Sequence, residues 1–465
     1  MSLVSKDGKR APLVSDNHFA LTRRMVLIFV LLTLVSSIVI GWHAGDISKT
    51  TLGYAINWGR MQAGWDSWRA MLEAIEHLRE KPTLLYEDIF FGQGVKFQYP
   101  LSALLLLDVP ERVTGLGWYL LIRITNFICF ISVLAIAIAT CFIFINEMVI
   151  VNAQGEFRLD ARQRLFLIFV SLVVVTVFYP VTKSFSLGQI QTLITLAVCI
   201  IFLAWQGKRF VSAGILVGIC CAIKPQWVVL ILWGALRKQW SFVLAATLTS
   251  SAIFIAAISM YGVGNFLDYF SVLSFLGRHG ESYYPNQSVN GLLHRLFFNG
   301  ENLEWQAKVF PPYHPIVHWM TLASSALILA TAMLWRRNKT PGTLDLALII
   351  LSLTMASPIA LDHHYGVLLP ILAVSLPAVL VLRAFGTWTA AYVWIAVFLV
   401  SQKLDELTKW FASTWLNPLQ SYLFFGSLMI LLLIYRTSVL DHLASYATAR
   451  NPLNTRRQAN FPESI

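Results

Sequence analysis

The chain has 465 residues, of which 57% are hydrophobic and only 13% are charged, and its formal net charge is +11. Soluble domains carry about 25% charged residues, so a chain this apolar, with a mean hydropathy of +0.65, is predicted to be an integral membrane protein. Lys and Arg stand in short clusters between apolar runs, which is a topology signal and not the pattern of a nucleic-acid-binding protein. All five cysteines fall inside apolar runs, so neither a disulfide framework nor a metal site is expected.

Apolar runs long enough to cross a hydrocarbon core of roughly 30 Å recur along the whole chain. We therefore predict an all-α polytopic membrane protein with about twelve transmembrane helices. The fifth and sixth spans are short, and Pro225 interrupts the chain between them. The predicted spans lie near residues 25–42, 117–146, 163–181, 189–206, 210–223, 226–237, 240–261, 316–336, 343–360, 365–382, 387–402 and 417–436.

Basic residues follow every second predicted span, and they decide the orientation. Cytoplasmic loops of membrane proteins carry an excess of Lys and Arg, so this spacing predicts that both termini lie inside. Merging the fifth and sixth spans would move the later basic clusters to the outer side, and we therefore keep these spans separate. The residues expected inside are Lys6, Lys9, Arg10, Arg23, Arg24, Arg158, Arg162, Arg164, Lys208, Arg209, Arg237, Lys238, Arg336, Arg337, Lys339, Arg383, Arg436, Arg450, Arg456 and Arg457.

The same topology predicts one transmembrane domain over residues 25–436, between a cytoplasmic N-terminal segment at 1–24 and a cytoplasmic tail at 437–465. Two long loops, at about 43–115 and 262–315, are left on the outer side.

The first outer loop contains an amphipathic stretch in which Met71, Leu72, Ile75 and Leu78 recur at helical spacing. This pattern predicts a helix that lies in the plane of the membrane interface. The apolar segment 101–107 then returns toward the membrane. Polar residues such as Lys403 are explained by solvation or by snorkelling of the side chain to the surface.

Once the topology is drawn, unusual polar residues gather on the outer side. Ionisable groups at membrane depth are costly, and they usually line a cavity or pair with one another. A cluster of both signs at one face therefore predicts a site for a charged substrate. Its candidate members are Asp66, Glu87, Asp88, Tyr99, Arg123, Lys183, Gln189, Gln191, Lys224, Asn286, Gln287, Arg295, His314, Asp362, His363 and His364.

Asp66 lies in the segment Gly64-Trp-Asp-Ser-Trp, just beyond the first predicted span. Flanking tryptophans suit a membrane interface. A carboxylate in this position is either a catalytic base or the N-cap of the amphipathic helix that follows, and local sequence leaves both interpretations open.

Four cations are candidates for binding an anion such as phosphate. Lys224 ends an apolar helix directly before a helix-breaking proline, a position that suits anion binding, although snorkelling to the surface is the alternative. Arg295 follows Asn286-Gln-Ser and offers a fork to phosphate oxygens. Arg123 and Lys183 stand at outer helix ends and are added to the phosphate site.

Adjacent histidines at 363 and 364 open a later membrane helix. No carboxylate or cysteine set at ligand spacing accompanies them, so a proton shuttle or a phosphate donor fits better than a metal site. The amide and phenol side chains expected to bind substrate are Tyr99, Gln189, Gln191, Asn286 and Gln287.

Six segments in this order resemble glycosyltransferase family 87. They are Asp66 after the first span, Phe97-Gln-Tyr-Pro, Gly188-Gln, Ala213-Gly-x-x-x-Gly ending in Lys-Pro, Asn286-Gln-Ser, and Ser357-Pro with His-His. The resemblance covers about Met25 to Leu382. This family comprises enzymes that use polyprenyl-phosphate sugars and have the GT-C fold, among them bacterial mannosyltransferases and arabinofuranosyltransferases.

The resemblance implies an inverting transfer on the outer face of a bacterial inner or plasma membrane, with mannose the expected sugar and a lipid or glycan as acceptor. Asp66 would deprotonate the acceptor hydroxyl, and His363 and His364 would bind the phosphate or orient the base. No cofactor is implied, because the lipid-linked sugar is itself a substrate. Two departures, Ala360-Leu361 in place of Ser-Trp and Pro100-Leu101 in place of a proline pair, leave sugar and acceptor specificity open.

A flippase or transporter of lipid-linked glycans is the alternative from a different class, because it would use the same cationic cavity. Asp66 favours the enzyme, since a transporter needs no base beside a phosphate site. Transporters also often show similarly broken helices in two halves, and the sequence shows no such pair.

Overall fold

The structure of the protein is a computed structural model that describes residues 16–151, 159–335 and 342–450. Within these ranges the regular elements are all helical, apart from one isolated bridge between Asn286 and Leu361, so the all-α expectation is confirmed. The α-helices are α1 (Asp16–Ala44), α2 (Thr51–Gly59), α3 (Asp66–Glu80), α4 (Leu101–Thr114), α5 (Trp118–Val151), α6 (Ala161–Thr176), α7 (Tyr179–Leu187), α8 (Gln191–Gln206), α9 (Phe210–Ile223), α10 (Val228–Leu236), α11 (Trp240–Tyr261), α12 (Val263–His279), α13 (Val289–Leu296), α14 (Pro315–Leu334), α15 (Thr343–Ala356), α16 (Leu368–Leu382), α17 (Thr389–Ser401), α18 (Asp405–Thr408) and α19 (Tyr422–Arg450). Short 3-10 or π segments are η1 (Ile47–Lys49), η2 (Tyr86–Gly92), η3 (Pro225–Trp227), η4 (Asp362–Val367), η5 (Gly386–Trp388), η6 (Lys409–Phe411) and η7 (Asn417–Ser421).

Among the described helices, six are long and apolar enough to cross a membrane, and α6 with α7 makes a seventh if this pair, bent by 63°, is one span. The remaining predicted spans fall on apolar helices of 10–17 residues, namely α8, α9, η3 with α10, α15, and η5 with α17. The chain is therefore an integral membrane protein by its helices, while the count of twelve spans stays a prediction. The six long spans are Val26–Ala44, Trp118–Ile150, Trp240–Tyr261, Pro315–Leu334, Asp362–Leu382 and Asn417–Leu440.

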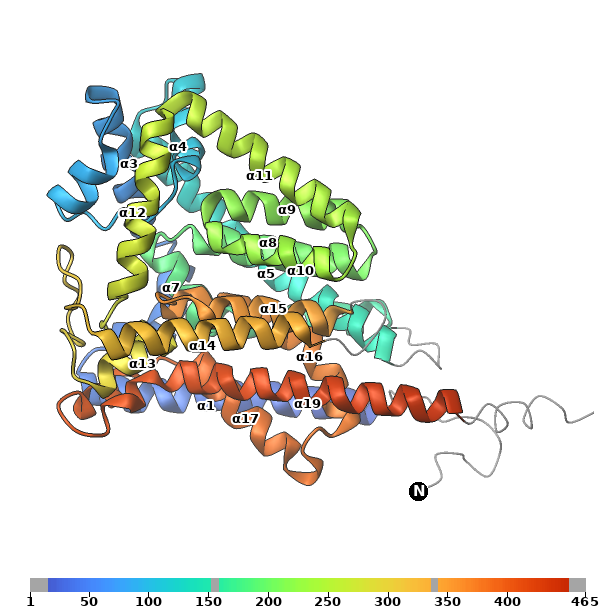
Figure 1. The fold of residues 1–465 in the computed structure, drawn as a ribbon. Helices are drawn as coiled ribbons and strands as arrows, with labels where there is room; N and C mark the ends of the chain where they lie inside the picture. The colour runs from blue at the N-terminus through green and yellow to red at the C-terminus, as the bar shows by residue number, and fades with distance from the viewer. Residues whose placement is uncertain (1–15, 152–158, 336–341, 451–465) are drawn as a thin grey trace, which may run out of the picture.

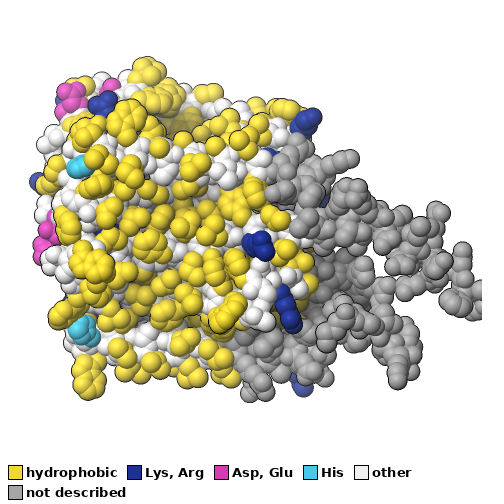
Figure 2. Space-filling view, turned by 60° about the horizontal axis from the view of Figure 1, so that its bottom comes forward, with side chains coloured by type: hydrophobic (Ala, Val, Ile, Leu, Met, Phe, Trp, Pro, Cys, Tyr) yellow, Lys and Arg dark blue, Asp and Glu magenta, His cyan; other side chains and the backbone are white. Residues whose placement is uncertain are grey.

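The bundle has one polar end, built from the two long loops that the sequence predicts to lie outside (the outer loops). Figure 1 shows α3, α12 and α13 gathered at the left, beside the ends of the long helices α14 and α19. In Figure 2 an apolar surface covers the middle of the molecule, and acidic and histidine side chains stand at the same left edge. Such a belt between polar ends is what a lipid bilayer requires.

Two basic turns lie at the other end of the bundle. Lys208, between α8 and α9, and Lys238, between α10 and α11, both have positive φ, 56° and 59°, in tight turns. Lys224, at the C-terminal end of α9, hydrogen bonds to Gln191 at the start of α8. Lys224 lies at the polar end of α9, so the α8–α9 turn lies at the opposite end of this helix. The α10–α11 turn lies at the same opposite end of the bundle.

Close packing of α9 on α11 depends on two glycines spaced four residues apart. A Cβ on Gly214 would overlap the carbonyl oxygen of Phe242, and a Cβ on Gly218 would lie 2.7 Å from the carbonyl oxygen of Ala246. Small residues at this spacing let two membrane helices approach closely. The Ala213-Gly-x-x-x-Gly segment thus has a packing role that places Lys224 at the end of a rigid pair of helices.

The amphipathic stretch of the first outer loop is the helix α3, but its apolar face contacts protein and not lipid. Met71, Ile75 and Leu78 are buried inside the protein, where α3 packs on α4. Amphipathic spacing shows that one face avoids water, and it does not show whether lipid or protein covers that face. Lipid contact by this face is therefore wrong, whereas the in-plane position of the helix at the interface stays a prediction.

Segment 101–107 begins α4, which packs on α11 and carries the fully buried Asp108. Arg79 donates to the Asp108 carboxylate at 2.5 Å, Arg112 at 3.0 Å and Tyr261 at 2.8 Å. Burial acts to raise the pKa of Asp108, but these hydrogen bonds outweigh burial and hold the pKa below its usual value. The network ties α3, α4 and α11 together.

Lys403 is another correction, because it is 4% exposed and therefore not solvated. Its ammonium lies 2.6 Å from the Asp405 carboxylate and 3.8 Å from Glu406. A buried cation needs a counter-charge, and the next turn of the chain supplies it.

The terminal helices α1 and α19 extend past the predicted domain borders, and the borders themselves stay a prediction. α1 begins at Asp16 and not near residue 25, and α19 runs to Arg450, beyond residue 436. The rest of the expected cytoplasmic segments, at 1–15 and 451–465, lies outside the described residues.

The topology can be tested with single cysteines in a background without the native cysteines, all five of which are buried. A membrane-impermeant maleimide applied to intact cells should label exposed positions at the polar end, Gln93→Cys and Glu304→Cys. Lys208→Cys and Lys238→Cys should react only after the cells are permeabilised. Labelling of either lysine position in intact cells would reverse the predicted orientation.

Candidate active site

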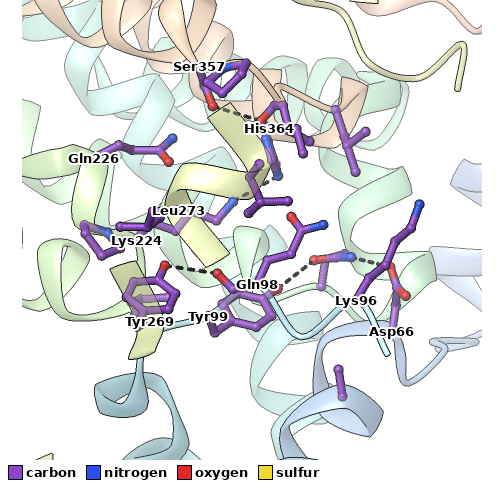
Figure 3. Close-up of a pocket in the computed structure, with 18 of the residues that line it drawn as sticks. Asp66, Lys96, Gln98, Tyr99, Lys224, Gln226, Tyr269, Leu273, Ser357 and His364 are labelled. Carbon is purple, nitrogen blue, oxygen red and sulfur yellow. Dashed lines mark hydrogen bonds between the residues drawn. The ribbon is translucent and has the colours of Figure 1, made fainter. Parts of the chain in front are cut away.

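A cavity of about 1300 Å³ opens at the polar end of the bundle. Its lining comes from both outer loops, from the break between α9 and η3, and from the segment that joins α15 to α16. In Figure 3, Lys224 lies on one side of the cavity, and Asp66 lies on the other. Elements that are far apart in sequence therefore contribute opposite charges to one cavity.

The segment that carries Asp66 is docked against the turn between α7 and α8. The Gly64 amide donates to the Ser186 carbonyl at 2.8 Å, and the Ser67 amide donates to the Gly188 carbonyl at 3.3 Å. Gly188 has φ +71°, and a Cβ there would overlap the carbonyl oxygen of Gly64. The glycine of Ser186-Leu-Gly-Gln is thus required both by its backbone conformation and by this close approach.

Asp66 is the first residue of α3, and the N-cap position before it is Trp65, which makes no side-chain capping bond. The Asp66 carboxylate instead accepts a hydrogen bond from the Gln189 amide and lines the cavity. The structure therefore shows no capping bond from this side chain, and the start of a helix favours its negative charge.

A short network fixes the amide that holds Asp66. The Ser67 hydroxyl donates to Gln189 Oε1 at 2.7 Å and lies 2.8 Å from the Tyr99 hydroxyl. Burial raises the pKa of Tyr99 above its usual value, so the phenol stays protonated and acts as a donor in this network. Two of the expected substrate-binding residues, Tyr99 and Gln189, thus meet at Asp66.

Lys224 occupies the opposite side of the cavity, where Pro225 ends α9. Its ammonium lies 2.8 Å from Gln191 Oε1 and 2.9 Å from His364 Nε2. When Lys224 is protonated, its ammonium only donates, so His364 then accepts through Nε2 and carries its proton on Nδ1. Within the described ranges, no carboxylate lies within ion-pair distance of Lys224, which makes it a cation suited to an anionic ligand.

Lys183 is placed differently, because its charge is already neutralised. Its ammonium lies 2.6 Å from the Asp362 carboxylate, which also accepts from the Tyr179 hydroxyl at 2.8 Å. Asp362 Oδ1 accepts from the His363 amide at 2.8 Å and lies 3.5 Å from His363 Nδ1. This arrangement orients His363, which lines the cavity, and leaves Lys183 outside the lining.

Arg295 and Arg123 do not reach the cavity. Arg295 is fully buried, and its guanidinium donates to the Ser421 hydroxyl at 2.8 Å and to the Asn286 carbonyl at 2.7 Å. Arg123 is exposed on α5 and lies over the Tyr119 ring at 5.6 Å. Neither guanidinium is among the cavity-lining groups.

Asn286 and Gln287 are also buried, and their side chains hydrogen bond to backbone groups. Asn286 accepts from the Ala360 amide at 3.0 Å and donates to the Pro358 carbonyl at 3.0 Å, while Gln287 donates to the Gln420 carbonyl at 2.8 Å. They fix the segment that leads into the two histidines, and they lie outside the cavity lining.

Sequence reasoning missed Lys96, Trp305 and Glu281. The Lys96 ammonium lies 2.7 Å from the Glu281 carboxylate and 4.0 Å from the centre of the Trp305 ring, joining the two outer loops. Burial lowers the pKa of Lys96, and the Glu281 carboxylate opposes this shift. The only local signal was that Lys96 precedes the Phe97-Gln-Tyr-Pro segment, because the partners are about two hundred residues away. Among the described residues, no group of three or more His, Cys, Asp or Glu is placed to hold a metal ion.

The fold and the cavity define a polytopic, all-helical membrane protein with an open cavity, lined by charged and apolar groups, at one end of its apolar helices. Residues 97–358 match the model of glycosyltransferase family 87, and the chain belongs to this family, which makes it a glycosyltransferase. The match contains Tyr99, Gln189 and Lys224, whereas Asp66 and the two histidines lie outside it. No curated protein and no solved structure matches the chain.

The docking of the Asp66 segment can be tested at Gly188. In Gly188→Ala the new Cβ overlaps Gly64, so Asp66 should be displaced and the sugar-transfer rate should fall about 10-fold or more, since small misplacements of reacting groups are costly. Gly115→Ala is the matched control, because Gly115 has φ +67° and nothing within 4 Å of its Cβ. Both variants should lose about 1 kcal/mol of stability from the positive φ, measured by thermal unfolding. Equal transfer rates in the two variants would contradict the docking role.

Proposed function

We propose that this cavity transfers a sugar, with mannose the expected one, from a polyprenyl-phosphate donor to a hydroxyl group of a lipid or glycan acceptor, with inversion at the anomeric carbon. The observation that supports this most directly is at the start of α8. Gln189 holds the Asp66 carboxylate, and Gln191, two residues later, holds the Lys224 ammonium. A base and an anion site are thus kept at a fixed separation in one cavity.

Asp66 acts as the general base in this proposal. Its carboxylate takes the proton of the acceptor hydroxyl, whose oxygen attacks the anomeric carbon as the bond to the phosphate oxygen breaks. Polyprenyl phosphate leaves with the bonding electrons, and the Lys224 ammonium stabilises the charge that develops on it. Attack and departure on opposite sides of the anomeric carbon give the inverted product.

The two histidines have different tasks beside the leaving phosphate. His364 is held by Lys224 through Nε2 and completes the anion site, with its Nδ1 proton as a donor. His363 is oriented by Asp362 and Lys183, so Lys183 supports the site indirectly and is not itself a phosphate ligand. The donor is a substrate, so no cofactor is proposed.

The site is proposed to work in the GT-C arrangement, on the outer face of a bacterial inner or plasma membrane, where the donor, the acceptor and the surrounding lipids meet. Family membership favours the enzyme over a transporter of lipid-linked glycans. The catalytic test below separates the two, because a transporter does not need a base.

The base is tested by Asp66→Asn, which keeps the shape of the side chain and can still hydrogen bond. Turnover of a polyprenyl-phosphate sugar should fall by roughly 10² or more, the scale of lost general-base catalysis, while binding of polyprenyl phosphate should persist. Asp88→Asn is the control, since Asp88 lies in the outer loop, pairs with Lys81 and is outside the cavity lining. Wild-type turnover by Asp66→Asn would remove Asp66 from the mechanism.

The anion site is tested by Lys224→Met, which removes the charge and keeps most of the apolar stem. Affinity for a polyprenyl monophosphate in detergent micelles should drop by roughly 10- to 100-fold, the usual size of a lost charge-assisted hydrogen bond. Lys208→Met, at the far end of the bundle, should bind like the wild type. If Lys224→Met and the wild type bind with equal affinity, the phosphate is bound elsewhere.

A further inference from the structure

The wall of the cavity on the Asp66 side is built by contact between the two outer loops. Gly94 has φ +69°, and its Cβ position lies 3.1 Å from the Lys308 side chain. Next to it, the Lys96–Glu281 ion pair at 2.7 Å joins the loops, and both side chains are less than 10% exposed. The two outer loops are therefore held together. Ordering two long loops costs conformational entropy, and we take this as a sign that the wall serves the site.

Trp305 is the most exposed aromatic surface on this wall. Its side chain is 45% exposed and lines the cavity, although the Lys96 ammonium lies 4.0 Å from its ring centre and the Tyr283 ring lies 5.6 Å away. These neighbours hold the indole in place. A large aromatic side chain left open to a cavity is a binding surface more often than a packing surface.

Two of the cations on this wall are already paired. Lys96 is bound to Glu281, and Arg69 lies 3.0 Å from Glu73. The other polar groups of this wall include the amides of Gln93 and Gln98, the Asp66 carboxylate and the exposed Lys308 ammonium. Amides, a carboxylate and an ammonium together offer both acceptors and donors, so this wall suits a ligand with several hydroxyl groups.

The inverting geometry decides which substrate meets this wall. The acceptor oxygen and the leaving phosphate stand on opposite sides of the anomeric carbon. Figure 3 shows Lys224 at the left of the cavity and Asp66 with Lys96 at the right. If the phosphate lies at Lys224, the acceptor must approach from the side of Asp66 and Lys96, where Trp305 stands.

We propose that Trp305 is the platform of an acceptor subsite, on which a pyranose residue of the acceptor stacks with its hydroxyl groups toward Asp66 and the amides of Gln93 and Gln98. This inference rests on the proposed function, because that function assigns the phosphate to the Lys224 side. A pyranose ring has one face of C–H groups that packs on an indole and a rim of hydroxyl groups that neutral amides bind. A free glycan and a glycolipid present the same chemistry.

The subsite is tested by binding alone, without donor and without turnover. Methyl pyranosides of common hexoses, and the corresponding octyl pyranosides, are titrated into the purified protein in micelles and followed by saturation-transfer NMR. Trp305→Ala should weaken binding by roughly 5- to 10-fold, the scale of a lost aromatic contact, and Trp305→Phe should restore part of it. Trp415→Ala is the matched control, because Trp415 is an 82% exposed tryptophan of an outer segment outside the cavity lining.

Each outcome of this test has a definite meaning. Weaker binding in Trp305→Ala with unchanged binding in Trp415→Ala supports the subsite, and it assigns a glycolipid if only octyl glycosides bind and a glycan if methyl glycosides bind as well. Equal affinities in Trp305→Ala and the wild type, or no glycoside binding by the wild type, overturn it. Glycoside binding needs neither donor nor turnover, so loss of the acceptor subsite is measured separately from loss of the proposed catalytic function, which the turnover of Asp66→Asn reports.

Discussion

The start of α8 is the constraint on which the site depends. Gln189 and Gln191 bind the acid and the cation that come from two other parts of the chain. This works only because Gly188 lets the backbone of the Asp66 segment approach to hydrogen-bonding distance. Two amides, one in the turn before α8 and one at its first residue, therefore set the separation between a proton acceptor and an anion site, which is the property that transfer chemistry needs.

Charge pairing separates supporting residues from reacting ones. Asp108, Asp362 and Lys96 are buried with opposite charges, and each ties elements together that are remote in sequence. Burying a charge is costly unless it is paired. Asp66 and Lys224, in contrast, face the cavity and are held by neutral amides, so their charges remain available for a substrate.

The candidate site was only partly predictable. Asp66, Lys224 and His364 were found because an ionisable group next to apolar runs is unusual by itself. Arg295 and Asn286 had the same local appearance, yet they are buried and bind backbone carbonyls. Whether a polar side chain points into a cavity or into a loop core depends on contacts with distant segments, and no local pattern records those contacts.

By itself, the sequence determined the membrane class, the all-helical fold, the basic turns and the family, because hydropathy, charge placement and ordered motifs are properties of the chain. Only the tertiary structure decided that α3 buries its apolar face in protein and that Lys183 is neutralised by Asp362. It also decided that Trp305 lines the same cavity as Asp66. The physical reason is that burial and pairing are relations between segments up to several hundred residues apart, and these relations exist only once the helices have packed.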